Sequence, residues 1–190
     1  MTAFIIGNGK SRLSFNLSEL SSHGKIYGCN ALYRDYIPDV LVSVDPPITE
    51  EISLNDIPLR TEHYAREPLH DQSKLLTEEM HKGFSSGPIA CKLASIDRCS
   101  QVFLIGFDFT SDTGTINNVY AGTNGYKELN SEPTYHGNWV DQFKKVFDFH
   151  KEIMYYRVKA DNMFIPTDWK GISNIKNISV ETFHKMLNSI

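Results

Sequence analysis

The chain begins with Thr2-Ala-Phe-Ile-Ile-Gly-Asn-Gly9, an apolar strand pattern that runs directly into a glycine-rich turn. Glycine adopts positive φ angles without a steric penalty and allows a close approach to the main chain. In open α/β sheets, ligands bind in the crevice beyond the carboxyl ends of the strands. The stretch therefore predicts a strand whose end, at Gly7, Asn8 and Gly9, contributes to a nucleotide or phosphate site. An ordinary tight turn is the alternative.

Apolar segments and helix signals alternate along most of the chain, which predicts an α/β fold. The expected strands are 2–6, 25–28, 39–44, 61–65, 101–106 and 153–158, and the expected helices or helical turns are 13–20, 30–36, 73–82, 85–96, 136–150 and 180–187. This order predicts a Rossmann-like, mostly parallel sheet with helices on both faces. The 190 residues are expected to form a single domain, with a C-terminal extension over 159–190 that includes the last helix.

Polar residues stand where four of the expected strands end, at Asn8, Asn30, Asp45 and Asp108. Since the carboxyl ends of parallel strands meet at one edge of a sheet, these side chains are expected to surround a common site. An Asn amide offers both donor and acceptor groups, which suit hydroxyls and phosphate oxygens. Turn formation or capping by the same Asn and Asp residues is the alternative.

Ser86-Gly87-Pro88 opens an expected helix at the same edge of the sheet. The N-terminus of a helix carries unpaired N–H groups and partial positive charge, and it therefore binds phosphate. Ser86 and Gly87 are accordingly predicted phosphate-binding residues. A plain helix cap at Ser86 is compatible with that role.

The segment 110–135 is rich in Gly, Asn, Thr and Ser and contains Tyr120 and Tyr126. A structureless segment of about 25 residues inside a compact domain is usually either a functional lid or disordered. We predict a mobile, lid-like loop. Its tyrosines could serve either to bind a ligand or to pack the loop against the body.

Composition excludes several classes of function. The formal charge of −4, without a basic run, argues against binding to nucleic acid. Three cysteines without a CxxC pair predict free thiols and a cytoplasmic protein. No apolar run reaches 18 residues, so a transmembrane segment is not expected. A homo-oligomer is compatible with the composition.

Four stretches, in this order, resemble the bacterial lipooligosaccharide sialyltransferases, and equally the 6-hydroxymethylpterin diphosphokinase-like family that shares their fold. They are Ile5-Ile-Gly-Asn-Gly9, Gly28-Cys-Asn30, Ser86-Gly-Pro88 and Leu104-Ile-Gly-Phe-Asp-Phe109. The resemblance covers roughly residues 3–158, and the segment 48–80 matches poorly. It implies a nucleotide held at the strand ends of a Rossmann-like sheet.

Resemblance to the sialyltransferases implies a glycosyltransferase that uses a CMP-sugar donor and a glycan acceptor without a metal. Asn8 and Asn30 would hold the phosphate and ribose of the donor. A His of that family deprotonates the acceptor hydroxyl, and His136 is the candidate here. His136 precedes Gly137, whereas the family's His follows the glycine. A loop tyrosine that binds the leaving phosphate would be Tyr120 or Tyr126.

Resemblance to the diphosphokinase-like family rests on Ser43-Val-Asp-Pro46, which fits the pattern of that branch better. It implies transfer of diphosphate from ATP, with Asp45 and Asp108 holding Mg²⁺ through the oxygen ligands that hard cations prefer. A third hypothesis is a non-catalytic module that binds a nucleotide or sugar phosphate, since the position of His136 departs from the family pattern.

Overall fold

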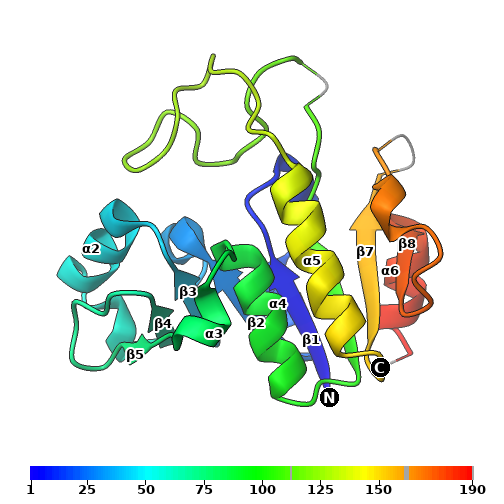
Figure 1. Ribbon diagram of the computed structural model, residues 1–190, viewed down its shortest axis with the longest axis horizontal. Coiled ribbons are helices and arrows are strands. Elements are labelled where there is room, and N and C mark those ends of the chain that lie inside the picture. The colour runs from blue at the N-terminus through cyan, green and yellow to red at the C-terminus, as the bar shows by residue number, and fades with distance from the viewer. Residues whose placement is uncertain (112, 161–162, 190) are drawn as a thin grey trace.

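The computed structural model describes residues 1–111, 113–160 and 163–189. One all-parallel sheet forms its centre (Figure 1). Its strands are β1 (Thr2–Ile6), β2 (Lys25–Cys29), β3 (Val40–Ser43), β4 (Glu62–Ala65), β5 (Lys74–Leu75), β6 (Gln101–Ile105), β7 (Met154–Lys159) and β8 (Ile175–Ser179). They are arranged in the order β5-β4-β3-β2-β1-β6-β7-β8. The direction of winding reverses between β1 and β6, so this is the switch point at which open α/β sheets bind ligands.

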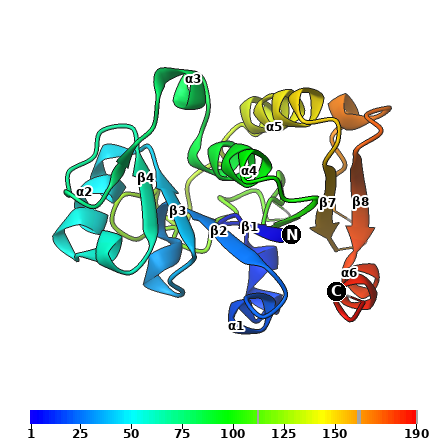
Figure 2. The same ribbon diagram turned by 90° about the horizontal axis from the view of Figure 1, so that it is seen from below.

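Helices cover both faces of the sheet, as the sequence predicts (Figure 2). They are α1 (Leu17–Leu20), α2 (Pro46–Leu54), α3 (Glu78–His81), α4 (Ser86–Ile96), α5 (Gly137–Phe149) and α6 (Val180–Leu187), with 3-10 turns η1 (Lys10–Ser14), η2 (Asn30–Arg34), η3 (Ile57–Leu59) and η4 (Thr167–Trp169). Apolar residues of α4 and α5 pack on one face, and those of α1, α2 and α6 pack on the other.

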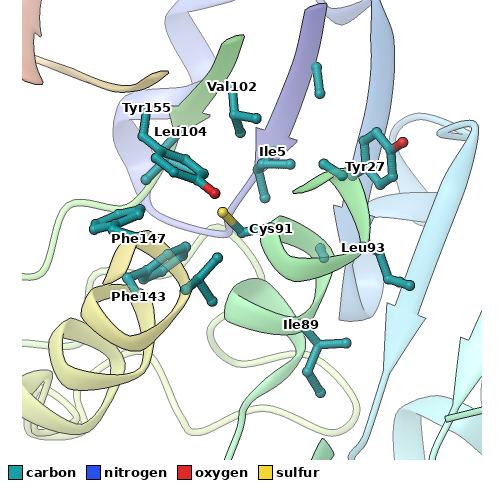
Figure 3. Packing of buried hydrophobic residues seen from close by; sticks show 14 of the residues in the cluster. Ile5, Tyr27, Ile89, Cys91, Leu93, Val102, Leu104, Phe143, Phe147 and Tyr155 are labelled. Atoms are coloured by element: carbon teal, nitrogen blue, oxygen red, sulfur yellow. The ribbon is translucent and has the colours of Figure 1, made fainter. Parts of the chain in front are cut away.

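The central strand β1 is buried on both sides. Ala3 and Ile5 belong to the core under α4 and α5, whereas Phe4 and Ile6 belong to the core on the opposite face. Figure 3 shows Ile5 close to Cys91 of α4, whose thiol is fully buried. A strand covered on both faces is uniformly apolar, which explains why β1 is so easily recognised in the sequence.

Several elements differ from the sequence-based expectation. The expected helix over 13–20 is helical only at Leu17–Leu20, and a separate 3-10 turn, Lys10–Ser14, precedes it. Helix α2 (Pro46–Leu54) was not predicted, although Pro46 and Pro47 occupy its first turn, where proline is favoured. The expected helix over 73–82 is wrong in its first half, which forms strand β5, and only Glu78–His81 is helical. Strand β8 (Ile175–Ser179) was also missed, because its polar Lys176 and Asn177 obscure the strand pattern of this edge.

Residues 106–136, apart from the undescribed Asp112, contain neither helix nor strand, in line with the predicted loop. The loop arches over the end of the sheet at which the strands finish (Figure 1). Within the described part of the chain, no helix is both long enough and apolar enough to cross a membrane.

A hydrogen-bonded chain of side chains connects β3, β4 and α2. The fully buried ring of His63 lies 2.9 Å (Nε2) from Ser43 Oγ and 2.8 Å (Nδ1) from Ser73 Oγ. Ser43 Oγ is in turn 2.8 Å from Thr49 Oγ1 on α2. Burial disfavours the charged imidazolium and lowers the pKa of His63 to about 4.

The free energy of unfolding is expected to decrease as the pH falls from 6.5 to 4. His63 has a lower pKa in the folded than in the unfolded chain, so its contribution is complete above pH 6.5 and is lost on acidification. The shift corresponds to about 3 kcal/mol. Urea unfolding at a series of pH values measures how the free energy of unfolding changes with pH. His63→Gln should flatten the profile, whereas His23→Gln, at a partly exposed turn, should leave it unchanged. If the free energy of unfolding of His63→Gln fell as steeply with decreasing pH as that of the wild-type protein, His63 would not be the source of the pH dependence.

Candidate functional site

A cavity of about 490 Å³ lies at the switch point, beyond the carboxyl ends of the strands. It is lined by the segments that follow β1, β2, β3 and β6, by the first turn of α4 and by part of the loop. Nine of the residues predicted from the sequence contribute to its wall: Gly7, Asn8, Gly9, Asn30, Asp45, Ser86, Gly87, Asp108 and Tyr126. Residues that are far apart in the sequence therefore meet around one hollow.

The glycines serve mainly to bring β1 and β6 together. Gly7 N donates to Ile105 O at 2.8 Å, and Gly9 N donates to Gly106 O at 2.8 Å. A Cβ atom on Gly7 would lie 2.6 Å from Gly106 O, and one on Gly9 would lie 2.6 Å from Asp108 Oδ2. The absence of side chains here is thus required by the neighbouring strand, in addition to any access it gives a ligand.

Ser86 connects three parts of the cavity wall. Its buried hydroxyl donates to Asn30 Oδ1 at 2.7 Å and accepts from Val44 N at 3.2 Å. The helix cap position belongs to Ser85 instead. Asn30 has a φ of 52°, a left-handed conformation that Asn tolerates better than most residues. The first-turn N–H groups of Ser86 and Gly87 have no acceptor within α4, so they can serve a ligand.

Tyr126 and Asn8 form a second polar part of the wall. The Tyr126 hydroxyl accepts from Asn8 Nδ2 at 3.1 Å and from Ala31 N at 3.2 Å. Burial raises the pKa of Tyr126 well above its usual value, so the hydroxyl keeps its proton and can donate it. Asn8 Oδ1 is buried and has no hydrogen-bond partner among the described residues. Since buried polar atoms are normally paired, this oxygen is an acceptor available to a ligand.

The two aspartates of the cavity have different environments. Asp108 is buried, and its carboxylate accepts from Ser11 N at 3.1 Å, from Asn117 Nδ2 at 3.0 Å and from Ser11 Oγ. Asp45 precedes α2, is exposed and makes no capping hydrogen bond. Asp108 is therefore occupied in holding η1 and the loop, whereas the Asp45 carboxylate is available. Across the described residues, no group of three or more His, Cys, Asp or Glu side chains could hold a metal ion.

Arg157 of β7 was not recognised from the sequence, although an arginine inside an apolar strand pattern is a usable signal. Its fully buried guanidinium donates to Phe107 O and Asp108 O, both at 2.8 Å. It also lies 5.0 Å from the ring centre of Phe109, whose φ of 59° is unusual for a bulky residue. Burial lowers the pKa of Arg157 to about 10, so the side chain stays charged at neutral pH. Arg157 thus fixes the turn that positions Asp108.

Tyr120 and His136 lie outside the main cavity. The Tyr120 hydroxyl is buried, accepts from Arg12 at 2.7 Å and donates to Asp35 at 2.8 Å. His136 immediately precedes α5 and lines a neighbouring hollow of about 340 Å³. This hollow shares six lining residues with the main cavity: Phe109, Ile116, Asn117, Asn118, Thr134 and Trp139. The predicted base therefore stands beside the cavity, and Tyr126 is the loop tyrosine that reaches its wall.

The rest of the wall includes four aromatic side chains, to which the sequence pattern assigned no role. Phe107, Trp139 and Phe143 supply apolar surface of the kind on which a nucleotide base packs. Lys127 is the one Lys or Arg among the described residues that line the cavity. Cys29 also lines it, but burial raises the pKa of its thiol to about 12, which makes it a poor nucleophile.

Comparisons with known proteins add no relative: no protein-family model, no curated protein and no solved structure matches the chain.

Proposed function

We propose that the chain is a transferase that binds a nucleotide-activated donor in the switch-point cavity, as a sialyltransferase-like glycosyltransferase would. One observation carries this proposal: the polar residues at four strand ends and the first turn of α4 line the same cavity. A cavity of about 490 Å³ falls within the usual range for small-molecule sites. The three buried free cysteines fit a cytoplasmic location.

The phosphate of the donor is expected at the N-terminus of α4. The N–H groups of Ser86 and Gly87 point out of the first turn, and the helix dipole favours an anion there. The Tyr126 hydroxyl and the Lys127 ammonium can add donors from the loop side of the cavity. Such donors stabilise the charge that develops on a leaving phosphate.

The nucleoside is expected along the wall that adjoins the first turn of α4, where Trp139 Nε1 donates to Ser85 Oγ at 3.2 Å. The unpaired Asn8 Oδ1 can accept from an amino group or a hydroxyl, and the Asp45 carboxylate can accept from ribose hydroxyls. Trp139 and Phe107 offer apolar surface for the base. No metal is needed in this arrangement.

In the proposed transfer, an acceptor hydroxyl attacks the sugar carbon that carries the phosphate. The new carbon–oxygen bond forms as the bond to the CMP oxygen breaks, and the nucleotide leaves with that electron pair. His136 is proposed to take the proton of the acceptor hydroxyl, with the acceptor entering by the hollow that His136 lines. Closure of the loop would exclude water, which would otherwise hydrolyse the donor.

A second proposal, diphosphate transfer from ATP, is favoured by the exposed carboxylate of Asp45, which makes no capping hydrogen bond. Mg²⁺ is commonly bound by one or two carboxylates together with substrate phosphates, so Asp45 would fit such a site. Asp108 is a weaker candidate ligand because Ser11 and Asn117 already occupy its oxygens. A third proposal, a binding module without catalysis, is favoured by the position of His136 outside the main cavity.

CMP and CDP are expected to raise the melting temperature without Mg²⁺, because ligands that bind only the folded state stabilise it by mass action. The stabilisation is about 2.7 kcal/mol at a hundredfold excess over Kd. A thermal-shift screen with CMP, CDP, UDP, GDP and ATP, each with and without Mg²⁺, measures the effect. A shift with ATP and Mg²⁺ alone would favour the diphosphokinase proposal. No shift with any of these nucleotides would refute nucleotide binding in all three proposals.

Asp45→Asn separates the roles of that carboxylate. If Asp45 accepts ribose hydroxyls, the substitution should weaken CMP binding about tenfold, as expected for loss of one charge-assisted hydrogen bond. Mg²⁺ should then leave the Kd for CMP unchanged in both the wild-type protein and Asp45→Asn. Isothermal titration gives the Kd values, and Glu50→Gln, an exposed position on the same helix, is the matched control. A Kd for CMP that Asp45→Asn leaves unchanged contradicts the ribose role.

A further inference from the structure

The loop is fastened to the body of the protein beside the cavity. Val119 N donates to Asn8 O at 2.8 Å, and Asn117 Oδ1 accepts from Lys10 N at 2.9 Å. Asn117 also donates to Asp108, as described above. These contacts hold the part of the loop that precedes Tyr120. The part that follows it, up to Tyr126, is held by a different group of residues.

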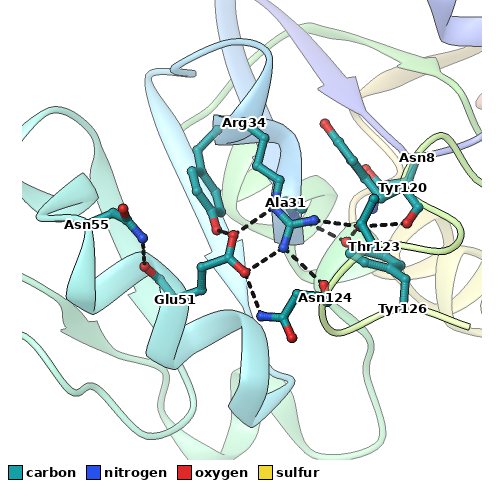
Figure 4. Close-up of polar contacts among 10 residues, drawn as sticks. Asn8, Ala31, Arg34, Glu51, Asn55, Tyr120, Thr123, Asn124 and Tyr126 are labelled. Carbon is teal, nitrogen blue, oxygen red and sulfur yellow. Dashed lines mark hydrogen bonds and ion pairs between the residues drawn. The ribbon is translucent and has the colours of Figure 1, made fainter.

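Arg34 of η2 and Glu51 of α2 form a forked ion pair at this second point (Figure 4). Arg34 Nε and Nη2 donate to the two carboxylate oxygens at 2.7 and 2.6 Å. The same guanidinium donates to Thr123 Oγ1 at 2.7 Å and to Asn124 O at 3.0 Å. Glu51 Oε2 in turn accepts from Asn124 Nδ2 at 2.9 Å. We refer to these four residues as the clamp.

The environment makes the clamp stronger than an ordinary surface ion pair. The side chains of Arg34 and Glu51 are 20% and 21% exposed. The bidentate geometry is the favourable one for a guanidinium and a carboxylate. Arg34 lowers the pKa of Glu51 to about 2, so the pair stays charged at any pH of interest. The guanidinium also lies 5.7 and 5.9 Å from the ring centres of Tyr120 and Tyr126.

Tyr126 lies two residues beyond Asn124 and, together with Asn8, forms a polar part of the cavity wall. The intervening Gly125 has a φ of +77°, and a Cβ atom there would lie 2.6 Å from Ile48 Cδ1 of α2. The turn is therefore seated closely on α2. If the turn were released from Arg34 and Glu51, Tyr126 would lose the support that keeps its hydroxyl near Asn8.

We propose that the Arg34–Glu51 ion pair positions Tyr126 in the cavity wall by clamping the 123–124 turn, and thereby controls how fast a ligand leaves. Arg34 and Glu51 are positioning residues, because neither lines the cavity. The role of the ion pair in ligand exit rests on the proposed function, whereas its role in holding the 123–124 turn does not.

Hydrogen exchange followed by mass spectrometry tests the clamp without a ligand. The amides of Gly122, Thr123 and Tyr126 donate to Lys127 O, Tyr120 O and Thr123 O, so their exchange reports opening of the turn. Glu51→Gln should accelerate exchange over 119–127 at least about tenfold, since it removes charge-assisted hydrogen bonds. Arg34→Lys should do the same, because lysine keeps the charge but lacks the fork.

Glu50→Gln is the control, since this neighbouring side chain of α2 is exposed. The proposal would be overturned if the amides of 119–127 exchanged no faster in Glu51→Gln than in Glu50→Gln. Exchange that accelerates equally in β1 and β6 would also overturn it, because the pair would then stabilise the whole fold instead of the turn.

Stopped-flow displacement of CDP tests the effect on ligand exit. The CDP dissociation rate should increase about tenfold in Glu51→Gln and remain unchanged in Glu50→Gln, matching the increase in loop opening. An unchanged rate would overturn the role in ligand exit. If CDP fails to bind the wild-type protein, the donor assignment is wrong, and the exchange experiment still decides whether the clamp exists.

Discussion

The close contact between the ends of β1 and β6 is the constraint on which the cavity depends. The two strands remain hydrogen-bonded beyond their last residues, through Gly7 N and Gly9 N. A Cβ atom on Gly106 would lie 2.8 Å from Gly7 O, so neither strand end accepts a side chain. This contact places Asn8 and Asp108 on neighbouring strands at the switch point. Any substitution that separates the strands would also separate the two polar ends.

Arg157 provides the support behind this contact. Its guanidinium donates to the carbonyl groups of Phe107 and Asp108 and so holds the turn that follows β6. A buried cation is costly unless its N–H groups are hydrogen-bonded, and here they donate to three backbone oxygens and to Asn177 Oδ1. The turn after β6 thus owes its shape to β7. The sequence motif alone does not reveal this dependence.

Much of the fold was predictable because buried parallel strands are uniformly apolar and end abruptly in polar residues. That pattern identified β1, β3 and β6 and placed six lining residues at one edge, namely Gly7, Asn8, Gly9, Asn30, Asp45 and Asp108. It failed for β5 and β8, whose pairing is imposed by the neighbouring strand. It also failed to separate Tyr126 from Tyr120. Both are loop tyrosines, and only their tertiary partners, Asn8 for one and Arg12 with Asp35 for the other, distinguish them.

The distribution of charge bears on which ligand the cavity would accept. Arg12 and Arg157 are buried, bind protein groups and do not line the cavity. Lys127 is the one Lys or Arg among the described lining residues. A triphosphate would meet the Asp45 carboxylate with one lysine and the dipole of α4 to offset its charge, and would therefore require Mg²⁺. A CMP-sugar carries a single phosphate, which neutral donors and one helix N-terminus can balance. Helix α2 begins beside Asp45 and carries Glu51 of the clamp one and a half turns later. A ligand bound at Asp45 and a turn held by Glu51 would thus act on the same helix. Any coupling between them must be reciprocal, so the free energy that the clamp adds to ligand binding equals the free energy that the bound ligand adds to loop closure.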